Sequence, residues 1–132
     1  MSEFPTVWIV DDDPDDQLFL EIAFKQLIPP VKIRKLNDGN ELLPCLEEVN
    51  VLPKLILLDL NMTYKNGFET LADLRASPSY KDLPVVVLTT SSALEDKHRS
   101  LLLGADGYLI KSPIYHKTVD MLKDLVTEWQ LN

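Results

Sequence analysis

A run of aspartates follows the first apolar segment of the chain. Directly after "VWIV" come Asp11, Asp12, Asp13, Asp15 and Asp16. Carboxylates repel one another, and an ionised carboxylate is costly to remove from water. An acidic run by itself is usually a solvated surface or a helix cap. Polar residues elsewhere in the chain therefore decide whether this run has a chemical role.

Three such residues, Asp59, Thr89 and Lys111, stand at the ends of later apolar segments. The carboxyl ends of parallel strands emerge at one edge of a sheet, so we expect these side chains beside Asp11 and Asp12. Three carboxylates in one crevice need a divalent cation, and ligation by oxygen alone favours Mg²⁺ or Mn²⁺.

A hydroxyl and an ammonium beside these carboxylates suit a phosphoryl group. Its oxygens accept hydrogen bonds from Thr89 and Lys111, while the metal neutralises charge. A carboxylate can itself be the nucleophile and form an aspartyl phosphate. Asp59 is the candidate nucleophile, because its strand is expected between the strands that end at Asp11 and at Thr89.

Five short apolar runs, which alternate with segments of helical periodicity, are expected to position these residues. The runs are Val7–Val10, Val31–Leu36, Leu55–Leu58, Val85–Leu88 and Tyr108–Ile110. The alternation is typical of repeated βαβ units and predicts an α/β fold, a five-stranded parallel sheet with helices on both faces. The third run is wholly apolar and indicates a central strand, whereas the second run alternates and indicates an edge. This difference favours the strand order 2-1-3-4-5.

Composition restricts the classes of function. The 132 residues are 45% hydrophobic and 26% charged, which predicts one globular domain spanning residues 1–132. The formal net charge of −8 argues against direct nucleic-acid binding, which depends on clustered Lys and Arg. No segment is apolar enough to cross a membrane, and the start of the chain does not have the pattern of a secretion signal. The single Cys45 cannot form an internal disulfide, so we expect a cytoplasmic protein.

Five stretches in order, "IVDDD", "LILLDLNM", "NGFETL", "PVVVLTT" and "GADGYLIK", resemble a bacterial two-component response-regulator receiver domain over nearly the whole chain. The resemblance implies a flavodoxin-like, chemotaxis-receiver-like protein with a single domain and no output domain. It implies that Asp59 accepts a phosphoryl group from a histidine kinase or phosphotransfer protein, and that an unknown downstream protein reads the signal. No enzymatic activity is expected beyond self-phosphorylation from phosphodonors and slow autodephosphorylation.

The resemblance also assigns roles to individual residues. The implied Mg²⁺ ligands are Asp12, Asp59, the backbone carbonyl of Asn61, and Asp11 through water. Thr89 and Lys111 are assigned to phosphoryl contact, and Thr89 with Tyr108 to the conformational switch. Phosphorylation is expected to be read on the face that contains Tyr108 and the helices before and after its strand.

Three positions depart from the usual pattern of the family. Thr63 follows Met62 where the family has proline, Asn66 precedes Gly67 where it has aspartate, and Ser112 separates Lys111 from Pro113. A cis peptide bond before a residue other than proline costs about 2.5–4 kcal/mol, so we expect a trans Lys111–Ser112 bond. Lys111 is nevertheless expected to point into the site.

Two other functions fit parts of the sequence. Asp11 and Asp13 after an apolar strand also match the start of haloacid-dehalogenase-like phosphohydrolases, although Asp59 would then have no comparable role. A receiver-like scaffold that works without phosphorylation would keep the fold alone. Replacement of Asp59 by Asn separates the first possibility from a receiver, because the phosphohydrolase would keep its Asp11 nucleophile.

The helix after the aspartate run is expected to begin with Asp13 as N-cap and Pro14 as its first residue. Helical spacing places four residues on one buried stripe: Leu20, Ala23, Phe24 and Leu27. Leu18 and Ile22 fall on the opposite side, and we predict that they contact the phosphodonor protein. Trp8 and Cys45 are expected in the core.

Overall fold

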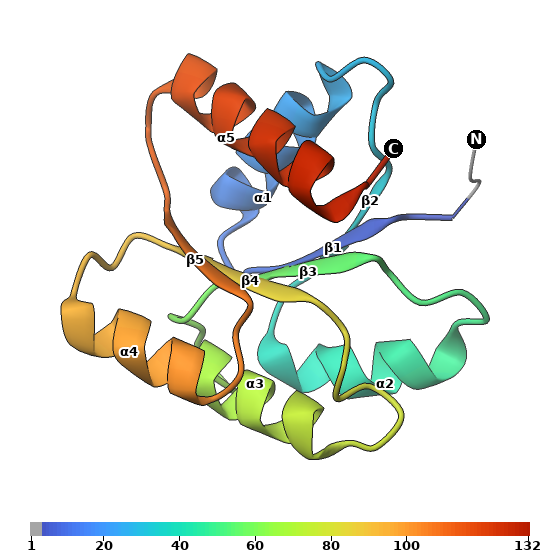
Figure 1. Cartoon of the computed structure of the whole chain (residues 1–132), viewed down its shortest axis with the longest axis vertical. Helices are drawn as coiled ribbons and strands as arrows, with labels where there is room; N and C mark the ends of the chain where they lie inside the picture. Colours follow the sequence, from blue (N-terminus) through green and yellow to red (C-terminus); the bar gives the residue numbers. More distant parts are fainter. Residues whose placement is uncertain (1–3) are drawn as a thin grey trace.

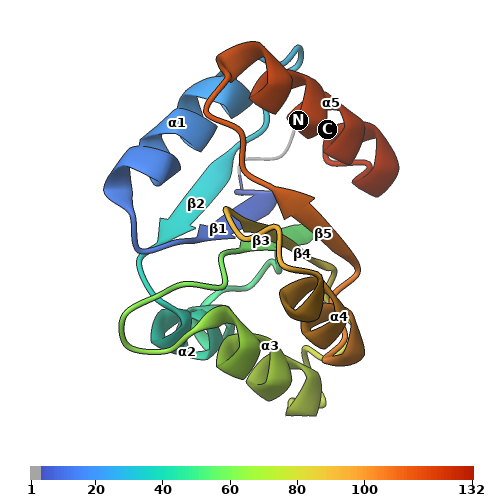
Figure 2. The same cartoon turned by 90° about the vertical axis from the view of Figure 1, so that its left-hand side faces the viewer.

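The computed structural model describes residues 4–132, which form a parallel five-stranded sheet between two layers of helices (Figure 1). The strands are β1 Val7–Val10, β2 Ile33–Leu36, β3 Leu55–Leu58, β4 Val85–Thr89 and β5 Gly107–Ile110. The helices are α1 Pro14–Lys25, α2 Leu42–Glu48, α3 Gly67–Ala76, α4 Leu94–Leu102 and α5 Tyr115–Trp129, with a 3₁₀ turn, η1, at Gly39–Glu41. α1 and α5 cover one face of the sheet, and α2, α3 and α4 cover the other (Figure 2).

The order of the sheet is β2-β1-β3-β4-β5, as predicted, and every neighbouring pair is parallel. The register matters for the site. Val10 pairs with Leu36 on one side and with Leu58 on the other. The residues that follow β1 and β3, Asp11 and Asp59, therefore leave the sheet at the same level.

The strand boundaries differ slightly from those predicted. β2 begins at Ile33 rather than at Val31. Val31 is buried by packing, but the regular pairing of β2 with β1 starts with Ile33 opposite Val7. Before this point the Lys32 carbonyl accepts the Thr6 N–H at 3.1 Å. β4 extends by one residue to include Thr89, and β5 begins one residue earlier, at Gly107.

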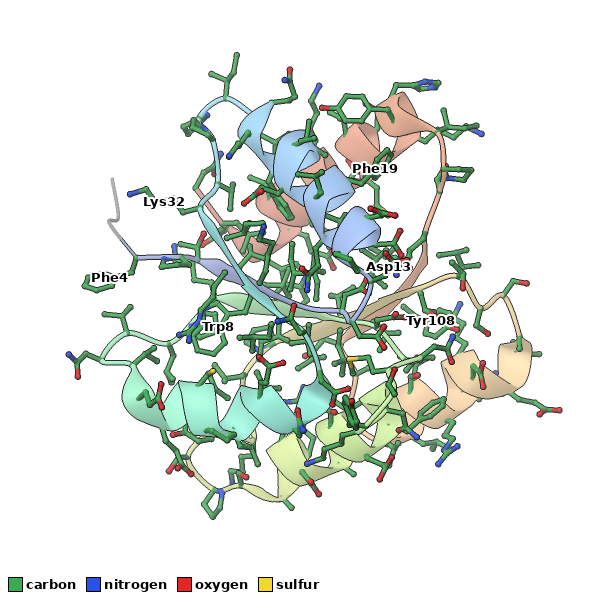
Figure 3. The ribbon with its side chains drawn as sticks, turned by 180° about the vertical axis from the view of Figure 1, so that it is seen from behind. Phe4, Trp8, Asp13, Phe19, Lys32 and Tyr108 are labelled. Carbon is green, nitrogen blue, oxygen red and sulfur yellow. The ribbon has the colours of Figure 1, made fainter. Side chains whose placement is uncertain are left out.

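Two apolar clusters fill the spaces on either side of the sheet. Val7 and Ile9 pack towards α1 and α5, while Trp8 and Val10 pack towards α2 and α3. Figure 3 shows Trp8 on the α2 side of the sheet. Because both faces are covered, the central strands β1 and β3 are apolar at every position and buried throughout.

The start of α1 agrees with the sequence. Asp13 is the N-cap, and its Oδ1 accepts the backbone N–H groups of Asp15 at 2.9 Å and Asp16 at 3.4 Å. Pro14 occupies the first turn, where its missing N–H costs nothing. The predicted apolar stripe is buried: Leu20, Ala23, Phe24 and Leu27.

The prediction for the core is right for Trp8 and wrong for Cys45. Trp8 is 1% exposed, whereas Cys45 is half-buried. Cys45 packs against the edge of the cluster that contains Trp8, and Arg34 lies beside both, with its guanidinium 4.9 Å from the Trp8 ring and donating to Cys45 Sγ at 3.4 Å. The cysteine therefore borders a cation at the rim of α2. In residues 4–132 no helix is long and apolar enough to cross a membrane.

Candidate functional site

Three carboxylates meet where β1 and β3 end. Asp11, Asp12 and Asp59 each place one carboxylate oxygen within 4.8 Å of the other two. Asp11 and Asp59 are buried, and Asp12 is half-buried. The structure thus brings together the three carboxylates that the sequence placed at strand ends, in a group of the size that a divalent cation requires.

The backbone around the carboxylates leaves little freedom. Asp13 N–H donates to Asp11 Oδ1 at 2.9 Å, and Asp59 N–H donates to the Val10 carbonyl at 3.0 Å. A Cβ on Gly67 would lie 2.4 Å from the Asp59 carbonyl oxygen, so a residue without a side chain is needed where α3 begins against β3.

Asp12 and Asn61 occupy the solvent side of this group. Asp12 Oδ2 accepts both the backbone N–H and the hydroxyl of Thr63, at 3.0 and 2.9 Å. Asn61 follows Asp59 in the loop after β3, where its backbone N–H donates to the Asp59 carboxylate and its side chain is exposed. Thr63, one of the departures from the family pattern, therefore fixes Asp12.

Lys111 points into the site from the end of β5. Its Nζ lies 2.7 Å from Asp11 Oδ2, 2.7 Å from Asp16 Oδ2 and 3.5 Å from Asp59 Oδ2. The one cis peptide bond among residues 4–132 is Ile28–Pro29, so the Lys111–Ser112 bond is trans, as expected.

The electrostatics of the site follow from burial. Removal from water raises the pKa of Asp11 and of Asp59, although Lys111 opposes the rise in both. Burial alone would lower the pKa of Lys111, but its hydrogen bonds to Asp11 and Asp16 and the charge of Asp59 outweigh burial and raise it. The ammonium therefore stays charged and is the internal counter-ion of the acidic group.

Thr89 and Tyr108 converge on the loop after β4 rather than on the carboxylates. Thr89 is fully buried, and its Oγ1 accepts the Ser91 N–H at 3.3 Å. The Tyr108 hydroxyl donates to the Ser91 carbonyl at 2.8 Å. Asp13 and Tyr108 lie at the same end of the sheet in Figure 3. Ser91, to which the sequence assigned no part in the switch, links the two residues assigned to it.

Sequence reasoning also missed Gln17 and Asp38. The buried Gln17 amide donates to the Asp11 and Leu36 carbonyls and so ties α1 to the ends of β1 and β2. Its helical spacing from Leu20 would have revealed burial on the inner stripe of α1.

Asp38 fixes the loop that follows Asp59. Its carboxylate is buried and accepts the backbone N–H groups of Tyr64 and Lys65, each at 3.0 Å, and that of Asn40 at 3.1 Å. In the sequence Asp38 precedes Gly39, and an Asp-Gly pair indicates only a turn. Its contacts with the loop depend on an approach of segments 26 and 27 positions apart.

The arrangement argues against the phosphohydrolase alternative. That chemistry needs the carboxylates of both Asp11 and Asp13 at the reacting centre. Asp13 is exposed, and its carboxylate is the N-cap of α1. Asp59, which this alternative leaves without a role, lies instead beside Asp11 and Asp12.

Known proteins share both the sequence pattern and the fold. Residues 7–123 match the family described as the response regulator receiver domain. The response regulator Rcp1 of Synechocystis sp. is 32% identical over 128 residues, which cover 93% of this chain and 87% of Rcp1. The nitrate/nitrite response regulator NarL of Escherichia coli is 37% identical over 130 residues, covering 94% of this chain and 54% of NarL.

Solved structures agree with this relationship. The phosphorylated cyanobacterial phytochrome response regulator RcpA superposes with a TM-score of 0.85 at 30% identity, covering 94% of this chain and 92% of RcpA. The Mn²⁺-bound form of Rcp1 superposes with a TM-score of 0.80 at 31% identity, covering 95% and 94%. The chain therefore belongs to the receiver domain family of two-component response regulators, whose members act as phosphorylation-dependent switches.

Proposed function

We propose that Asp59 accepts a phosphoryl group from a histidine kinase or phosphotransfer protein in a reaction that depends on Mg²⁺. One observation carries the proposal. The buried Asp59 carboxylate lies within 4.8 Å of two other carboxylates and 3.5 Å from the Lys111 ammonium. A single nucleophilic oxygen, a metal-binding group and a fixed cation are thus present in one place.

The residues of the site fit a small divalent cation. Asp12, Asp59 and the Asn61 carbonyl would hold the ion directly, and Asp11 would hold it through water. An oxygen-only set of this kind suits Mg²⁺, and Mn²⁺ is a reasonable substitute. The existence of an Mn²⁺-bound form of the relative Rcp1 supports this choice of cation. The metal, when bound, offsets negative charge on the phosphoryl oxygens.

The transfer step needs little from the protein beyond positioning. An Asp59 oxygen forms a bond to phosphorus, while the phosphorus–nitrogen bond of the donor phosphohistidine breaks. The donor imidazole leaves with the electron pair of that bond and takes up a proton. Lys111 supplies a positive charge at the phosphoryl group, and the Thr89 hydroxyl donates a hydrogen bond to it.

The donor protein is proposed to bind beside the site on α1. Leu18 is 51% exposed and Ile22 is 44% exposed, one turn apart on this helix. α1 begins at Pro14, directly after its N-cap Asp13 and close to the carboxylates, so a protein that covers Leu18 and Ile22 can place a phosphohistidine over Asp59.

The signal is proposed to leave through α4, β5 and α5. When Thr89 turns towards a phosphoryl oxygen, its bond with Ser91 N–H breaks and the loop that holds the Tyr108 hydroxyl is free to move. Exposed apolar side chains border this route, including Leu102 and Ile110. We propose that residues 1–132 work in the cytoplasm as one receiver domain that signals by protein contact and has no catalytic turnover beyond its own phosphorylation and dephosphorylation.

Mass spectrometry after incubation with acetyl phosphate tests the proposal. The wild-type protein should gain one phosphoryl group with Mg²⁺ and none with excess EDTA. Hydroxylamine should remove the group, because an acyl phosphate is labile to it. Asp59→Asn should remain unlabelled. Labelling of Asp59→Asn at the wild-type level would contradict the assignment and return attention to Asp11.

A further inference from the structure

Lys111 is closer to two other carboxylates than to the candidate phosphoacceptor. Its Nζ lies 2.7 Å from Asp11 and 2.7 Å from Asp16, but 3.5 Å from Asp59. The lysine side chain is 14% exposed, and that of Asp16 is 39% exposed. Asp16 belongs to α1, so the helix that follows Asp11 and Asp12 supplies one of the two short contacts of the ammonium.

The proposed function leaves this contact unexplained. Asp16 is absent from the three carboxylates that can share a metal ion. The capping of α1 is performed by Asp13, and Asp15 supplies a second acidic side chain in the same first turn. Asp16 interacts favourably with the dipole of α1 whether or not it contacts Lys111. Neither the capping of α1 nor its dipole therefore accounts for the contact.

The contact between Asp16 and Lys111 occupies one of a small number of hydrogen-bond donors. A lysine ammonium has three N–H donors, and three carboxylates already surround Lys111. A phosphoryl group on Asp59 adds new acceptors on the Asp59 side. Lys111 can turn a further donor towards them only by loosening a present contact, and Asp16 is the one partner among the three that does not belong to the metal-binding group.

A small cavity beside Lys111 leaves its side chain space to change rotamer. A cavity of about 30 Å³, enough for one water molecule, lies between α1 and α5 and is bordered by Asp16, Lys111, Phe19 and Leu88. The lysine stem is therefore not tightly packed on that side, and the ammonium can exchange partners without displacing the backbone.

We propose that Asp16 is a positioning residue that holds Lys111 in the unphosphorylated protein and competes with the phosphoryl group for its ammonium. The inference rests on the proposed function, because it assumes that a phosphoryl group forms on Asp59. Asp16 then sets how tightly the protein holds that group, without itself touching either the group or the metal.

Beryllium fluoride, a mimic of the phosphoryl group on a carboxylate, provides the test. Its dissociation constant is measured at saturating Mg²⁺ by calorimetry, with ¹⁹F NMR to confirm binding at one site. Asp16→Asn keeps the shape and removes the charge, and should bind beryllium fluoride at least about threefold tighter, since a half-exposed ion pair is lost as a competitor. Asp15→Asn removes the same charge from the same turn and should stay within about twofold of wild type.

The background variant Lys111→Met separates positioning from simple charge repulsion. With Lys111 replaced, the gain from Asp16→Asn should fall to that from Asp15→Asn. An undiminished gain in this background would overturn the inference, as would equal affinities of Asp16→Asn and Asp15→Asn when Lys111 is present. Failure of the wild-type protein to bind beryllium fluoride would instead refute the proposed function, and the inference with it.

A structure of the wild-type complex with Mg²⁺ and beryllium fluoride supplies an independent readout. Lys111 Nζ should lie within hydrogen-bond distance of a fluoride and no longer within that distance of Asp16. An ammonium that still contacts Asp16 at its present distance, and leaves the fluoride without a lysine partner, would contradict the exchange.

Discussion

Asp59→Asn should stabilise the protein in the absence of metal. In the metal-free site, Asp59 lies within 4.8 Å of the Asp11 and Asp12 carboxylates and 3.5 Å from the Lys111 ammonium. At an effective dielectric constant of about 20, each carboxylate repels Asp59 by about 3.5 kcal/mol, and Lys111 attracts it by about 5 kcal/mol. A net repulsion of about 2 kcal/mol remains. Burial, which raises the pKa of Asp59, disfavours the charged carboxylate as well.

The magnitude is measurable by thermal unfolding. A chain of 132 residues has an unfolding entropy of about 0.28 kcal/mol/K, so a stabilisation of about 2 kcal/mol raises Tm by about 7 °C. The experiment compares wild type with Asp59→Asn by circular dichroism in EDTA at pH 7. Asp124→Asn, which removes one exposed charge on α5, is the control for net charge and should leave Tm unchanged.

The pH dependence of Tm provides a second test of whether Asp59→Asn stabilises the protein. The pKa of Asp59 is raised in the folded state, so the stability linked to its protonation is present below the unfolded value of 3.8 and is lost as pH rises through the folded pKa. The advantage of Asp59→Asn should therefore be largest near neutral pH and shrink towards pH 4. A lower Tm for Asp59→Asn in EDTA at pH 7, or an advantage that grows on acidification, would refute the reasoning.

Three further predictions concern the metal, the start of α3 and the exposed pair on α1. Mg²⁺ at ten times its dissociation constant should stabilise wild type by about 1.4 kcal/mol and raise Tm by about 5 °C, whereas Asp12→Asn should lose most of this shift in the same melting assay. Gly67→Ala should lower stability by about 1–3 kcal/mol in urea unfolding, because its Cβ would lie 2.4 Å from the Asp59 carbonyl oxygen; unchanged stability would show that α3 can move away. Replacing Leu18 and Ile22 together by Gln should slow transfer from the cognate kinase at least about tenfold, as expected when exposed anchors of an interface are lost. Labelling by acetyl phosphate should stay at the wild-type rate, and equal slowing of both reactions would argue against a docking role.

The residues within each strand and directly after it carried most of the information about the fold. The uninterrupted apolar run at Leu55–Leu58 predicted a central strand, and the alternating run around Arg34 predicted an edge strand, because burial on one or two faces leaves different patterns. The parallel order then placed Asp11, Asp59 and Lys111 at one edge. These inferences needed only local patterns and the rule that parallel strands end together.

The sequence by itself therefore determined the sheet order, the identity of the acidic group and the presence of a lysine beside it. Only the tertiary structure decided which partners each group selects. Lys111 contacts Asp16 across 95 positions, and Asp38 supports the loop after Asp59 across 26 and 27 positions. Such contacts depend on rotamers, on burial and on the approach of separate elements, none of which leaves a periodic pattern in the sequence. For the same reason the burial of Cys45 was overpredicted, since only the packing of α2 against the sheet places this residue at the edge of the core.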